Sequence, residues 1–430
     1  MPAAPTAAAL PLIPTPRTAC RLCHGRLDPL LLLGLLTANG FPLPDDPPLP
    51  LVPLDLYVCA TCRLVQLRHT VPAETLFRSQ YWYRSAVNEV MVAELASVVG
   101  TALRHVTLGA YDLLLDIGAN DGTLLQQYRA SAQPRAVREA IRVAFEPAQN
   151  LEAACRQHCE VLVPDFFPEG LSQLHVEGRV KVLTSIAMIY DLDDPRRFVR
   201  AVDAVLHGDG VWIVQFQDLW SMLRATAFDN IVSEHLCYYS LRTFEPLLDG
   251  TDLCLVDAEQ RAINGGSYRL LIRRRRYADT ATRRLAQLRQ DEAPAYDWDT
   301  LERFAWRVGT VKTQIAASLQ ALADSGRVVD LYAASTKANT LTQVCRIDPA
   351  IVRQAWERSP EKVGRLTATG IPIVSEAAGR ADPPDALLLG AWQFRDAFVQ
   401  READFLTAGG LMVVPLPEVE IISAAKAGVR

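Results

Sequence analysis

Short apolar runs separated by helical and charged stretches recur through most of this 430-residue chain. Four runs in the middle of the chain are largely apolar, which is typical of strands buried on both faces of a parallel sheet: 113–117, 141–145, 180–185 and 210–217. Two further runs, 254–258 and 268–273, are expected to pair at the edge of the same sheet. The pattern predicts an α/β unit with a doubly wound sheet.

A second series of apolar runs follows a charged, helical stretch over residues 276–326. These runs predict another sheet of the same kind, with strands at 328–333, 386–389 and 411–414. We therefore expect three parts: a disordered arm plus a zinc-binding domain over 1–75, the first α/β unit over 76–275, and the helical connector plus a Rossmann-like domain over 276–430.

Composition and charge narrow the function. The net charge of −5 does not favour nucleic acid, and no apolar run reaches the roughly 20 residues that cross a bilayer. Residues 1–16 carry no charged side chain, so they predict a disordered arm and not a signal peptide. Nine cysteines without an export signal indicate a reducing compartment, so we expect a cytoplasmic protein that uses cysteines for metal.

Four cysteines form two Cys-x-x-Cys pairs on either side of residues 24–58, namely Cys20, Cys23, Cys59 and Cys62. Two residues between thiolates let both sulfurs face one ion, and two such turns complete a tetrahedral zinc site. Four thiolates leave no open position, so the zinc is expected to be structural. The long separation needs a loop, for which the proline-rich stretch 42–53 is the candidate.

The first apolar run leads into a turn with two glycines, and a helix is expected to begin near Thr123. Gly118 and Gly122 let the backbone approach a ligand closely, and the helix start presents free N–H groups. Asp116 and Asp121 place carboxylates in the same turn. Two anions suit a ligand with a positive charge and hydroxyls better than they suit a pyrophosphate.

The following strands end in residues of matching chemistry. Glu146 ends the second run, where an acidic residue commonly accepts hydrogen bonds from a ribose diol. Asp165 and Phe166 combine a polar group and an aromatic ring that suit an adenine. This order resembles the S-adenosylmethionine (SAM)-dependent methyltransferases of the doubly wound type, which implies that the SAM-binding residues are Asp116, Gly118, Asn120, Asp121, Gly122, Glu146, Asp165, Phe166 and Ser185.

The densest run of proton-handling groups is 233–240, which contains Glu234 and His235. Histidine titrates near neutrality, so it can take a proton from a carbon that a neighbouring ketone makes acidic. The same pattern also fits a buried histidine held by hydrogen bonds. Tyr190 and Asp191 follow the run 180–185 and are placed near the reacting centre, because ligands bind at the carboxyl ends of such strands.

Several other stretches have two interpretations. Tyr81 and Tyr83, in an aromatic cluster before a helix, either pack in the core or reach over the active site. Gly265, Gly266 and Ser267 form a turn that either admits a ligand or makes a hairpin. Residues 334–340 form a small-residue turn entering a helix, where Lys337 suits a phosphate although the P-loop frame is missing. Lys362 and Arg365 add basic groups that serve the same anion or a solvated face.

Four features occur in one order along the chain: CRLC with CATC, LLLDIGANDGTLL with FEP, EHLCYYS, and LYAASTKANTLTQ with SPEKVGR. This order resembles the nucleotide-sugar C-methyltransferases of antibiotic deoxysugar pathways, from about Cys20 to about Pro417. The resemblance implies a zinc domain, a class I SAM domain and a Rossmann-like domain that helps to bind the sugar nucleotide. It implies a thymidine-diphosphate (dTDP) 4-keto-deoxysugar as the small-molecule substrate, methylation beside the ketone, and a monomer or homodimer.

Matching the family motifs by position assigns roles to individual residues. His235, in the Glu-His pair with Glu234, becomes the base that removes the proton beside the ketone. Tyr81 or Tyr83 falls in the aromatic motif before the SAM domain. The sugar-nucleotide positions are Gly265, Gly266, Ser267, Lys337, Lys362 and Arg365.

The chain departs from the family pattern at Val232, Ser233 and Asp191, where the family often has Tyr, His and His. Tyr190 and Asp191 are the candidates to take over part of the proton handling. An O- or N-methyltransferase remains an alternative, because the Glu-His pair also serves a hydroxyl or an amine. A nicotinamide-dependent oxidoreductase and a nucleic-acid-binding module are disfavoured, by the G-A-N-D-G turn and by the surroundings of the cysteine pairs.

Overall fold

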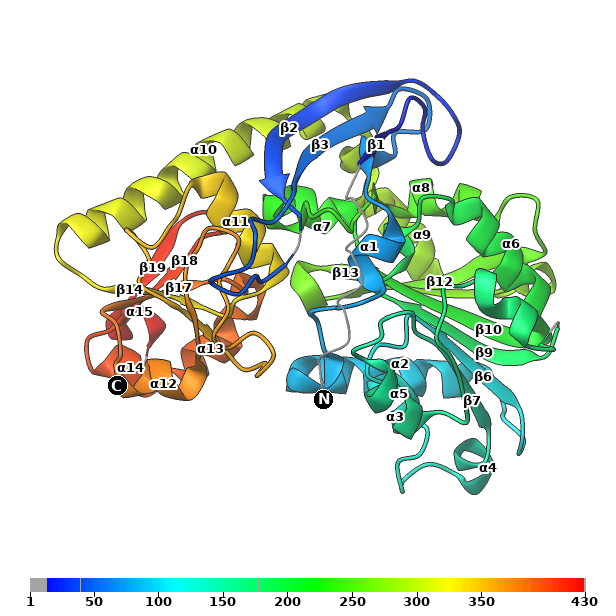
Figure 1. Cartoon of the computed structure of the whole chain (residues 1–430). Helices are drawn as coiled ribbons and strands as arrows, with labels where there is room; N and C mark the ends of the chain where they lie inside the picture. The colour runs from blue at the N-terminus through cyan, green and yellow to red at the C-terminus, as the bar shows by residue number, and fades with distance from the viewer. Residues whose placement is uncertain (1–13, 39, 177, 429–430) are drawn as a thin grey trace.

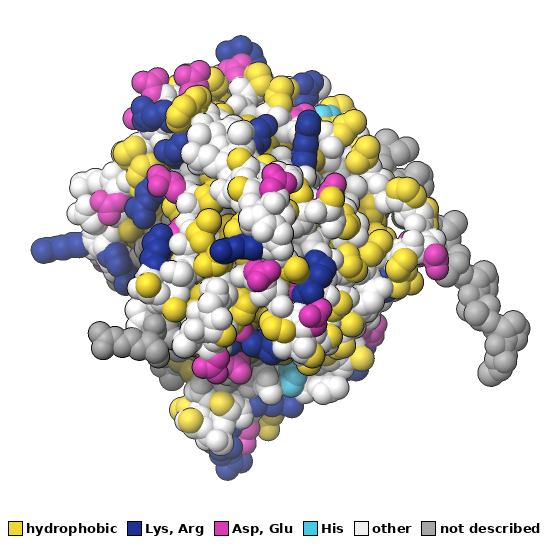
Figure 2. Space-filling view, turned by 90° about the vertical axis from the view of Figure 1, so that its left-hand side faces the viewer, with side chains coloured by type: hydrophobic (Ala, Val, Ile, Leu, Met, Phe, Trp, Pro, Cys, Tyr) yellow, Lys and Arg dark blue, Asp and Glu magenta, His cyan; other side chains and the backbone are white. Residues whose placement is uncertain are grey.

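The computed structural model describes residues 14–38, 40–176 and 178–428. Figure 1 shows two α/β units side by side, with the N-terminal strands lying across the top of both. The first unit is built on a seven-stranded sheet and the second on a six-stranded sheet. On the face seen in Figure 2, basic and acidic side chains are interspersed. None of the helices in the described part of the chain has the length and apolar character needed to span a bilayer.

The central sheet has the strand order β12-β13-β10-β9-β6-β7-β8. Its strands are β6 (Leu113–Ile117), β7 (Ile141–Phe145), β8 (Val161–Val163), β9 (Val180–Ile186), β10 (Leu206–Gln217), β12 (Leu253–Arg261) and β13 (Ser267–Arg274). The five strands β6 to β10 run parallel, β13 is antiparallel to β10, and β12 is antiparallel to β13. Counted along the chain, this is the 3-2-1-4-5-7-6 order of the class I methyltransferase fold, as predicted.

Helices cover both faces of the central sheet, which explains why its strands are apolar on both sides. Leu114 packs in one buried cluster with residues of α2 (Glu89–His105) and α3 (Thr123–Gln127). Leu113 and Leu115 point to the opposite face, where they join the cluster that contains Phe198 of α6 (Pro195–Val205). This alternation is the period-two arrangement of a strand.

The C-terminal sheet has the order β16-β15-β14-β17-β18-β19. Its strands are β14 (Val329–Tyr332), β15 (Ala355–Glu357), β16 (Ile373–Ser375), β17 (Ala386–Leu389), β18 (Leu411–Val414) and β19 (Glu420–Ile422). All are parallel except β19, which is antiparallel to β18. The predicted Rossmann-like unit is therefore present, joined to the central sheet by α9 (Arg283–Asp291) and the long α10 (Trp298–Asp324), and its first strand leads into α11 (Thr336–Cys345).

The N-terminal sheet has the order β11-β4-β3-β2. It contains β2 (Leu27–Thr37), β3 (Leu51–Cys59), β4 (Val65–Leu67) and β11 (Cys237–Tyr238), beside the small pair β1 (Thr15–Pro16) and β5 (His69–Thr70). Because β11 comes from the middle of the chain, the N-terminal and central parts share a sheet. The remaining helices are α1 (Ala73–Phe77), α4 (Arg135–Arg138), α5 (Glu152–Cys155), α7 (Leu219–Arg224), α8 (Leu241–Phe244), α12 (Glu376–Ala381), α13 (Arg395–Arg401), α14 (Ala403–Thr407) and α15 (Ala424–Ala427).

Two local predictions need correction. The proline-rich loop expected over 42–53 ends earlier, because Leu51 already begins β3 and Pro53 lies within it. Pro53 is tolerated because it lies before the stretch of β3 that pairs with β4, so that only β2 is its neighbour there. Residues 1–13 of the arm that was expected over 1–16 lie outside the described residues. The end of that stretch is not disordered, because Thr15 and Pro16 form β1.

Candidate active site

A cavity of about 260 Å³ lies at the carboxyl ends of β6, β7 and β9, where ligands bind in open α/β sheets. Thr336 and Lys337, at the start of α11, line the same cavity from the C-terminal unit. The predicted residues that line it are Tyr81, Tyr83, Asp116, Gly118, Asn120, Glu146, Asp165, Phe166, Tyr190, Asp191, Glu234, His235 and Lys337. The fold thus brings most of the residues predicted for cofactor binding and catalysis into one space, whereas Asp121, Gly122 and Ser185 are not part of its lining.

The glycine turn follows β6, whose five residues are all buried. Gly118 and Gly122 have φ values of +70° and +81°, in the left-handed region that favours glycine. Asp116 accepts a hydrogen bond from Thr184 Oγ1 at 2.6 Å, and burial raises its pKa to about 7. A positively charged ligand in the cavity would favour the ionised form of this carboxyl.

Glu146, at the end of β7, is oriented by two backbone N–H groups. Asn120 donates to its Oε2 at 2.7 Å, and Ala148 donates to its Oε1 at 2.9 Å. Burial raises the pKa of Glu146 to about 7. Each oxygen keeps a second lone pair, so the carboxylate can accept one hydroxyl on each oxygen, as a ribose diol requires.

The third predicted position also lies at the cavity wall. Asp165 accepts a hydrogen bond from the Phe166 backbone N–H at 2.9 Å and pairs with Arg78 Nη2 at 3.0 Å. The Arg78 guanidinium lies 4.9 Å from the centre of the Phe166 ring, which fixes the ring orientation. Ser185 differs, because it is buried inside the sheet, where it accepts a hydrogen bond from Trp212 Nε1 at 2.8 Å.

Asn120 and Asp121 hold the aromatic segment, residues 80–85, over the glycine turn. The Asn120 side chain accepts from the Ser85 backbone N–H at 3.0 Å and donates to the Tyr83 carbonyl at 3.0 Å. Asp121 accepts from the Ala86 backbone N–H at 2.9 Å. Asp121 does not line the cavity. Its contact explains its place in the turn all the same, because Asn120 and Asp121 together hold the aromatic segment there.

Asn150 holds the other end of the aromatic segment, and sequence reasoning missed it. Its amide accepts from the Tyr81 backbone N–H at 2.9 Å and donates to the Tyr81 carbonyl at 3.0 Å. The only local signal was an asparagine soon after the turn at Glu146. A pattern of that kind is too common to single out one residue.

His235 lies in the loop between η5 (Phe228–Asn230) and β11, and not at a helix start. Its Nδ1 lies 2.9 Å from the Asn230 carbonyl oxygen. A carbonyl only accepts, so Nδ1 carries the hydrogen and Nε2 keeps its lone pair in the neutral ring. Burial, with a smaller effect of the Lys337 charge, lowers the pKa of His235 to about 3. The ring is therefore neutral at neutral pH, and its Nε2 lone pair is unprotonated.

Tyr190 and Asp191, in η4 (Ile189–Asp191), stand beside this histidine. The Tyr190 ring contacts the His235 ring edge to face, with centroids 4.4 Å apart. Among the described residues, Oδ1 of Asp191 is buried without a hydrogen-bond partner. Burial and the neighbouring Glu234 raise the pKa of Asp191 well above its ordinary value, which favours the neutral carboxyl, the form that can donate a hydrogen bond.

The C-terminal unit contributes one cation to the cavity. Lys337 Nζ lies 3.5 Å from the carbonyl oxygen of Asn264, which also lines the cavity. Burial lowers the pKa of Lys337, and the nearby Asp229 opposes this shift. Asn264 belongs to the predicted turn over 264–267, but only residues 265–267 were expected to contact the substrate.

The remaining predicted substrate residues support this wall from behind. A Cβ on Gly266 would lie 2.3 Å from Ser221 Cβ, and the Ser267 hydroxyl donates to the Ile263 carbonyl at 3.1 Å. Gly265 has a φ of +86° in the same turn. These residues shape the loop that presents Asn264, so the structure places them next to the cavity and not on its surface.

Lys362 and Arg365 are engaged outside the cavity. Lys362 Nζ pairs with Glu357 at 3.0 Å and donates to the Ala334 carbonyl at 2.9 Å. Arg365 donates to the Phe41 carbonyl at 3.0 Å, and its guanidinium lies 5.0 Å from a ring centre of Trp82. The structure thus places both between parts of the protein, where they join the C-terminal unit to the N-terminal half.

The four predicted cysteine ligands converge. One sulfur from each lies within 4.8 Å of the others, with Cys20 and Cys62 at 3.6 Å and Cys23 and Cys59 at 3.4 Å. Gln66 Nε2 donates to Cys20 Sγ at 3.2 Å. Sulfurs packed this closely cannot all ionise without a cation, and four thiolates are the donor set of a structural zinc ion.

Comparisons with known proteins agree with this arrangement. The model "C-methyltransferase C-terminal domain" matches residues 262–417, and the model "Putative zinc binding domain" matches residues 20–77. The latter match and the cysteine cluster confirm the zinc-site prediction. C-methyltransferase NovU of Streptomyces niveus is 28% identical over 421 residues, which covers 95% of this chain and 98% of that protein.

Solved structures match parts of the chain. The mitomycin 7-O-methyltransferase MmcR has a TM-score of 0.34 and 19% identity, over 44% of this chain and 55% of that one. The magnesium protoporphyrin IX methyltransferase ChlM from Synechocystis PCC 6803, with bound SAM, has a TM-score of 0.32 and 10% identity, over 45% of this chain and 86% of that one.

Proposed function

Because the chain is a SAM-dependent methyltransferase of the C-methyltransferase family, we propose that it methylates the carbon beside the ketone of a dTDP-4-keto-deoxysugar. The observation that carries the proposal is His235, whose Nδ1 is fixed by the Asn230 carbonyl and whose neutral ring lines the cavity shared by both α/β units. An unprotonated nitrogen in a site of this kind is what proton removal from carbon requires.

The donor side of the cavity fits SAM. We assign the ribose to Glu146, whose two oxygens are already oriented, and the adenine to the wall formed by Asp165 and Phe166. Asp116 and Glu146 together supply the negative charge that suits a sulfonium compound. When bound, SAM supplies a methyl group on a positively charged sulfur, which is an activated leaving group.

The acceptor side handles the proton. His235 Nε2 removes the proton from the carbon beside the ketone, and the negative charge moves to the ketone oxygen as an enolate forms. Asp191, whose raised pKa favours the neutral carboxyl, donates a hydrogen bond to that oxygen when it carries its proton. After methyl transfer the carbonyl forms again, and His235 releases its proton to solvent. Tyr190 keeps the His235 ring in place through their edge contact.

The anionic part of the substrate belongs near the C-terminal unit. In the described part of that unit, Lys337 is the cation that lines the cavity, and it stands at the start of α11, whose free N–H groups favour an anion. Asn264 and Thr336 add polar groups beside it. This arrangement supports a small, negatively charged acceptor such as a sugar nucleotide.

The test is incubation with SAM and a panel of dTDP-4-keto-deoxysugars, followed by mass spectrometry and NMR. We expect one member to gain one methyl group, bonded to carbon beside the ketone. In deuterated water with S-adenosylhomocysteine in place of SAM, the same substrate should incorporate deuterium at that carbon. A methyl on oxygen or nitrogen without exchange would instead support an O- or N-methyltransferase.

A further inference from the structure

The N-terminal sheet, with the zinc knuckle at residues 20–23, is called the zinc-binding sheet below. It contacts the segment that carries Tyr190 and Asp191 and the segment that carries His235. Arg21 lies between two zinc ligands, Cys20 and Cys23, and its side chain is fully buried. Its Nε donates to Asp193 Oδ1 at 3.0 Å, and its Nη2 donates to Thr70 Oγ1 at 2.8 Å. A buried guanidinium is stable only while its donors find acceptors, so these contacts are fixed in geometry.

Asp193 is the acceptor that connects the zinc knuckle to the active site. Besides Arg21, it accepts from Arg17 Nη1 at 3.1 Å and from Thr70 Oγ1 at 2.8 Å. It stands two residues after Asp191, at the end of the loop that carries Tyr190. Arg196 Nε donates to the Leu22 carbonyl of the knuckle at 3.0 Å, so the start of α6 is held to the same turn.

A separate path leads from the zinc site to His235. Gln66 is buried between Cys20 and Arg21. Its Nε2 donates a hydrogen bond to Cys20 Sγ at 3.2 Å, and its Oε1 accepts one from the Arg21 backbone N–H at 3.1 Å. The backbone of Gln66 pairs with Cys237, two residues beyond the histidine. In addition, Leu67 donates to the Leu236 carbonyl at 2.9 Å.

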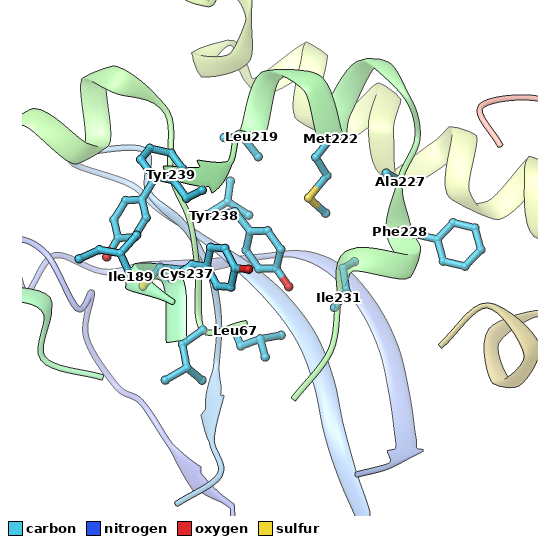
Figure 3. Close-up of a cluster of buried hydrophobic side chains, with 14 of the residues drawn as sticks. Leu67, Ile189, Leu219, Met222, Ala227, Phe228, Ile231, Cys237, Tyr238 and Tyr239 are labelled. Atoms are coloured by element: carbon cyan, nitrogen blue, oxygen red, sulfur yellow. The ribbon is translucent and has the colours of Figure 1, made fainter. Parts of the chain in front are cut away.

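Side-chain packing joins the same three segments. Figure 3 shows Leu67 of β4, Ile189 of η4 and Cys237 of β11 in one cluster of buried side chains. Ile189 directly precedes Tyr190, and Leu67 directly follows Gln66. The loop with Tyr190 and Asp191 and the loop with His235 are therefore both seated on the zinc-binding sheet.

We propose that Arg21 and Asp193 are positioning residues, which hold the loop of Tyr190 and Asp191 against His235 so that the order of the zinc knuckle sets the geometry of proton removal. The inference rests on the proposed function. Residues that orient catalytic groups from behind commonly change activity by about 10–100-fold when mutated, because small displacements at the reacting centre are costly.

Asp193→Ala is the decisive variant, since Asp193 is partly exposed and Arg21 keeps Gln66 and Thr70 as partners. We expect kcat to fall about 10–100-fold with the most active dTDP-4-keto-deoxysugar of the panel. The KM for SAM should stay within about twofold, because Asp193 does not line the cavity. The zinc content should be unchanged, because Asp193 contacts Arg21 and not the cysteine sulfurs. Asp193→Glu should recover part of kcat, since it restores the carboxylate.

Asp194→Ala is the matched control. The Asp194 carboxylate accepts from the Arg197 backbone N–H at 3.0 Å and caps α6, so its loss should lower thermal stability slightly and leave kcat near the wild-type value. Wild-type kcat in Asp193→Ala would overturn the proposal. An equal loss in Asp193→Ala and Asp194→Ala would also overturn it, because any disturbance of the loop would then suffice.

A second measurement is independent of turnover. Hydrogen–deuterium exchange should be faster over residues 188–192 in Asp193→Ala, where the Asp191 N–H donates to the Met188 carbonyl at 3.0 Å. Removing zinc from the wild-type protein with a chelator should speed exchange over both 188–192 and 234–238, while calorimetry still detects SAM binding. If zinc removal leaves the exchange of both segments unchanged, the positioning proposal is overturned, and this holds even if no sugar nucleotide is methylated. A wild-type protein that binds no SAM would instead refute the proposed function.

Discussion

The two α/β units face the same cavity with opposite charges. In the central unit, β6 passes through the glycine turn into α3 with Asp116 at its end, and Glu146 stands on the next strand. In the C-terminal unit, β14 passes through a small-residue turn into α11, which presents Lys337. Two sheets of similar topology thus present opposite charges near the connection between the first strand and the following helix.

This difference indicates how the donor and the acceptor are kept apart. A sulfonium compound is attracted to the carboxylates, and a diphosphate is attracted to the lysine and the helix start. His235 lies where the two sides meet, in the loop that precedes β11. Substitutions on one side should therefore change one affinity, and substitutions at the junction should change the chemical step.

The largest effect is expected at the junction. His235→Ala removes the proposed base, so turnover should fall about 10²–10⁴-fold, the usual contribution of a general base. The dissociation constant of SAM should stay within about twofold, since Asp116 and Glu146 are untouched. Single-turnover methylation and calorimetry measure the two quantities. The matched control is His207→Ala, because His207 Nδ1 accepts a hydrogen bond from the Asp209 backbone N–H. Unchanged turnover in His235→Ala would remove His235 from the mechanism.

The next effect belongs to the donor side. Glu146→Gln places an amide against the N–H groups of Asn120 and Ala148, where an NH₂ group finds donors instead of acceptors. We expect the dissociation constant of SAM to rise about 10–100-fold, the range for a lost hydrogen bond to a charged group. The KM for the sugar nucleotide should not change. Glu152→Gln is the control, because that side chain only pairs with Arg156 on the surface.

The acceptor side should show the mirror image. Lys337→Met keeps the length of the side chain and removes its charge, so the KM for the sugar nucleotide should rise about tenfold while SAM affinity stays the same. The pKa of His235 should also rise, because Lys337 contributes to holding it down. Steady-state kinetics measures the KM for the sugar nucleotide, and its pH profile follows the pKa of His235. Substitution of an exposed lysine, Lys312→Met, is the control. A loss of SAM affinity in Lys337→Met would contradict the separation of the two sides.

The central sheet and the zinc site were predicted closely from sequence because each rests on a local signal. Fully buried strands require apolar runs, and a tetrathiolate site requires two Cys-x-x-Cys pairs. The strands β8, β15, β16 and β19 were not predicted, since three-residue strands leave no readable period. The insertion of β11 into the N-terminal sheet was also missed, because two residues at Cys237 carry no sign of a distant partner.

The candidate site was predicted well where a functional residue lies at the end of a strand. It was predicted less well where tertiary contacts decide the position of a residue. Glu146 directly follows β7 and Asp116 lies next to the last residue of β6, so both reach the cavity. Lys362 and Arg365 fall in the expected motifs, yet their position beside Glu357 and Trp82 depends on how the parts of the chain pack. Asn150 is invisible in the sequence for the same reason, since its importance lies in contacts with Tyr81, 69 residues away.

The pH dependence of SAM binding tests the charge of the donor side without any substitution. Burial raises the pKa of Asp116 and Glu146 to about 7, so both carboxyls lose their charge as the pH falls through that value. SAM favours the ionised forms, and its affinity should therefore be highest above pH 7 and decrease toward pH 5.5, by at most about tenfold per pH unit for each proton taken up. Calorimetry across this range measures it. S-adenosylhomocysteine, which lacks the positive sulfur, should show a shallower decrease, and an equal slope for both compounds would mean that the carboxylates contact only the ribose.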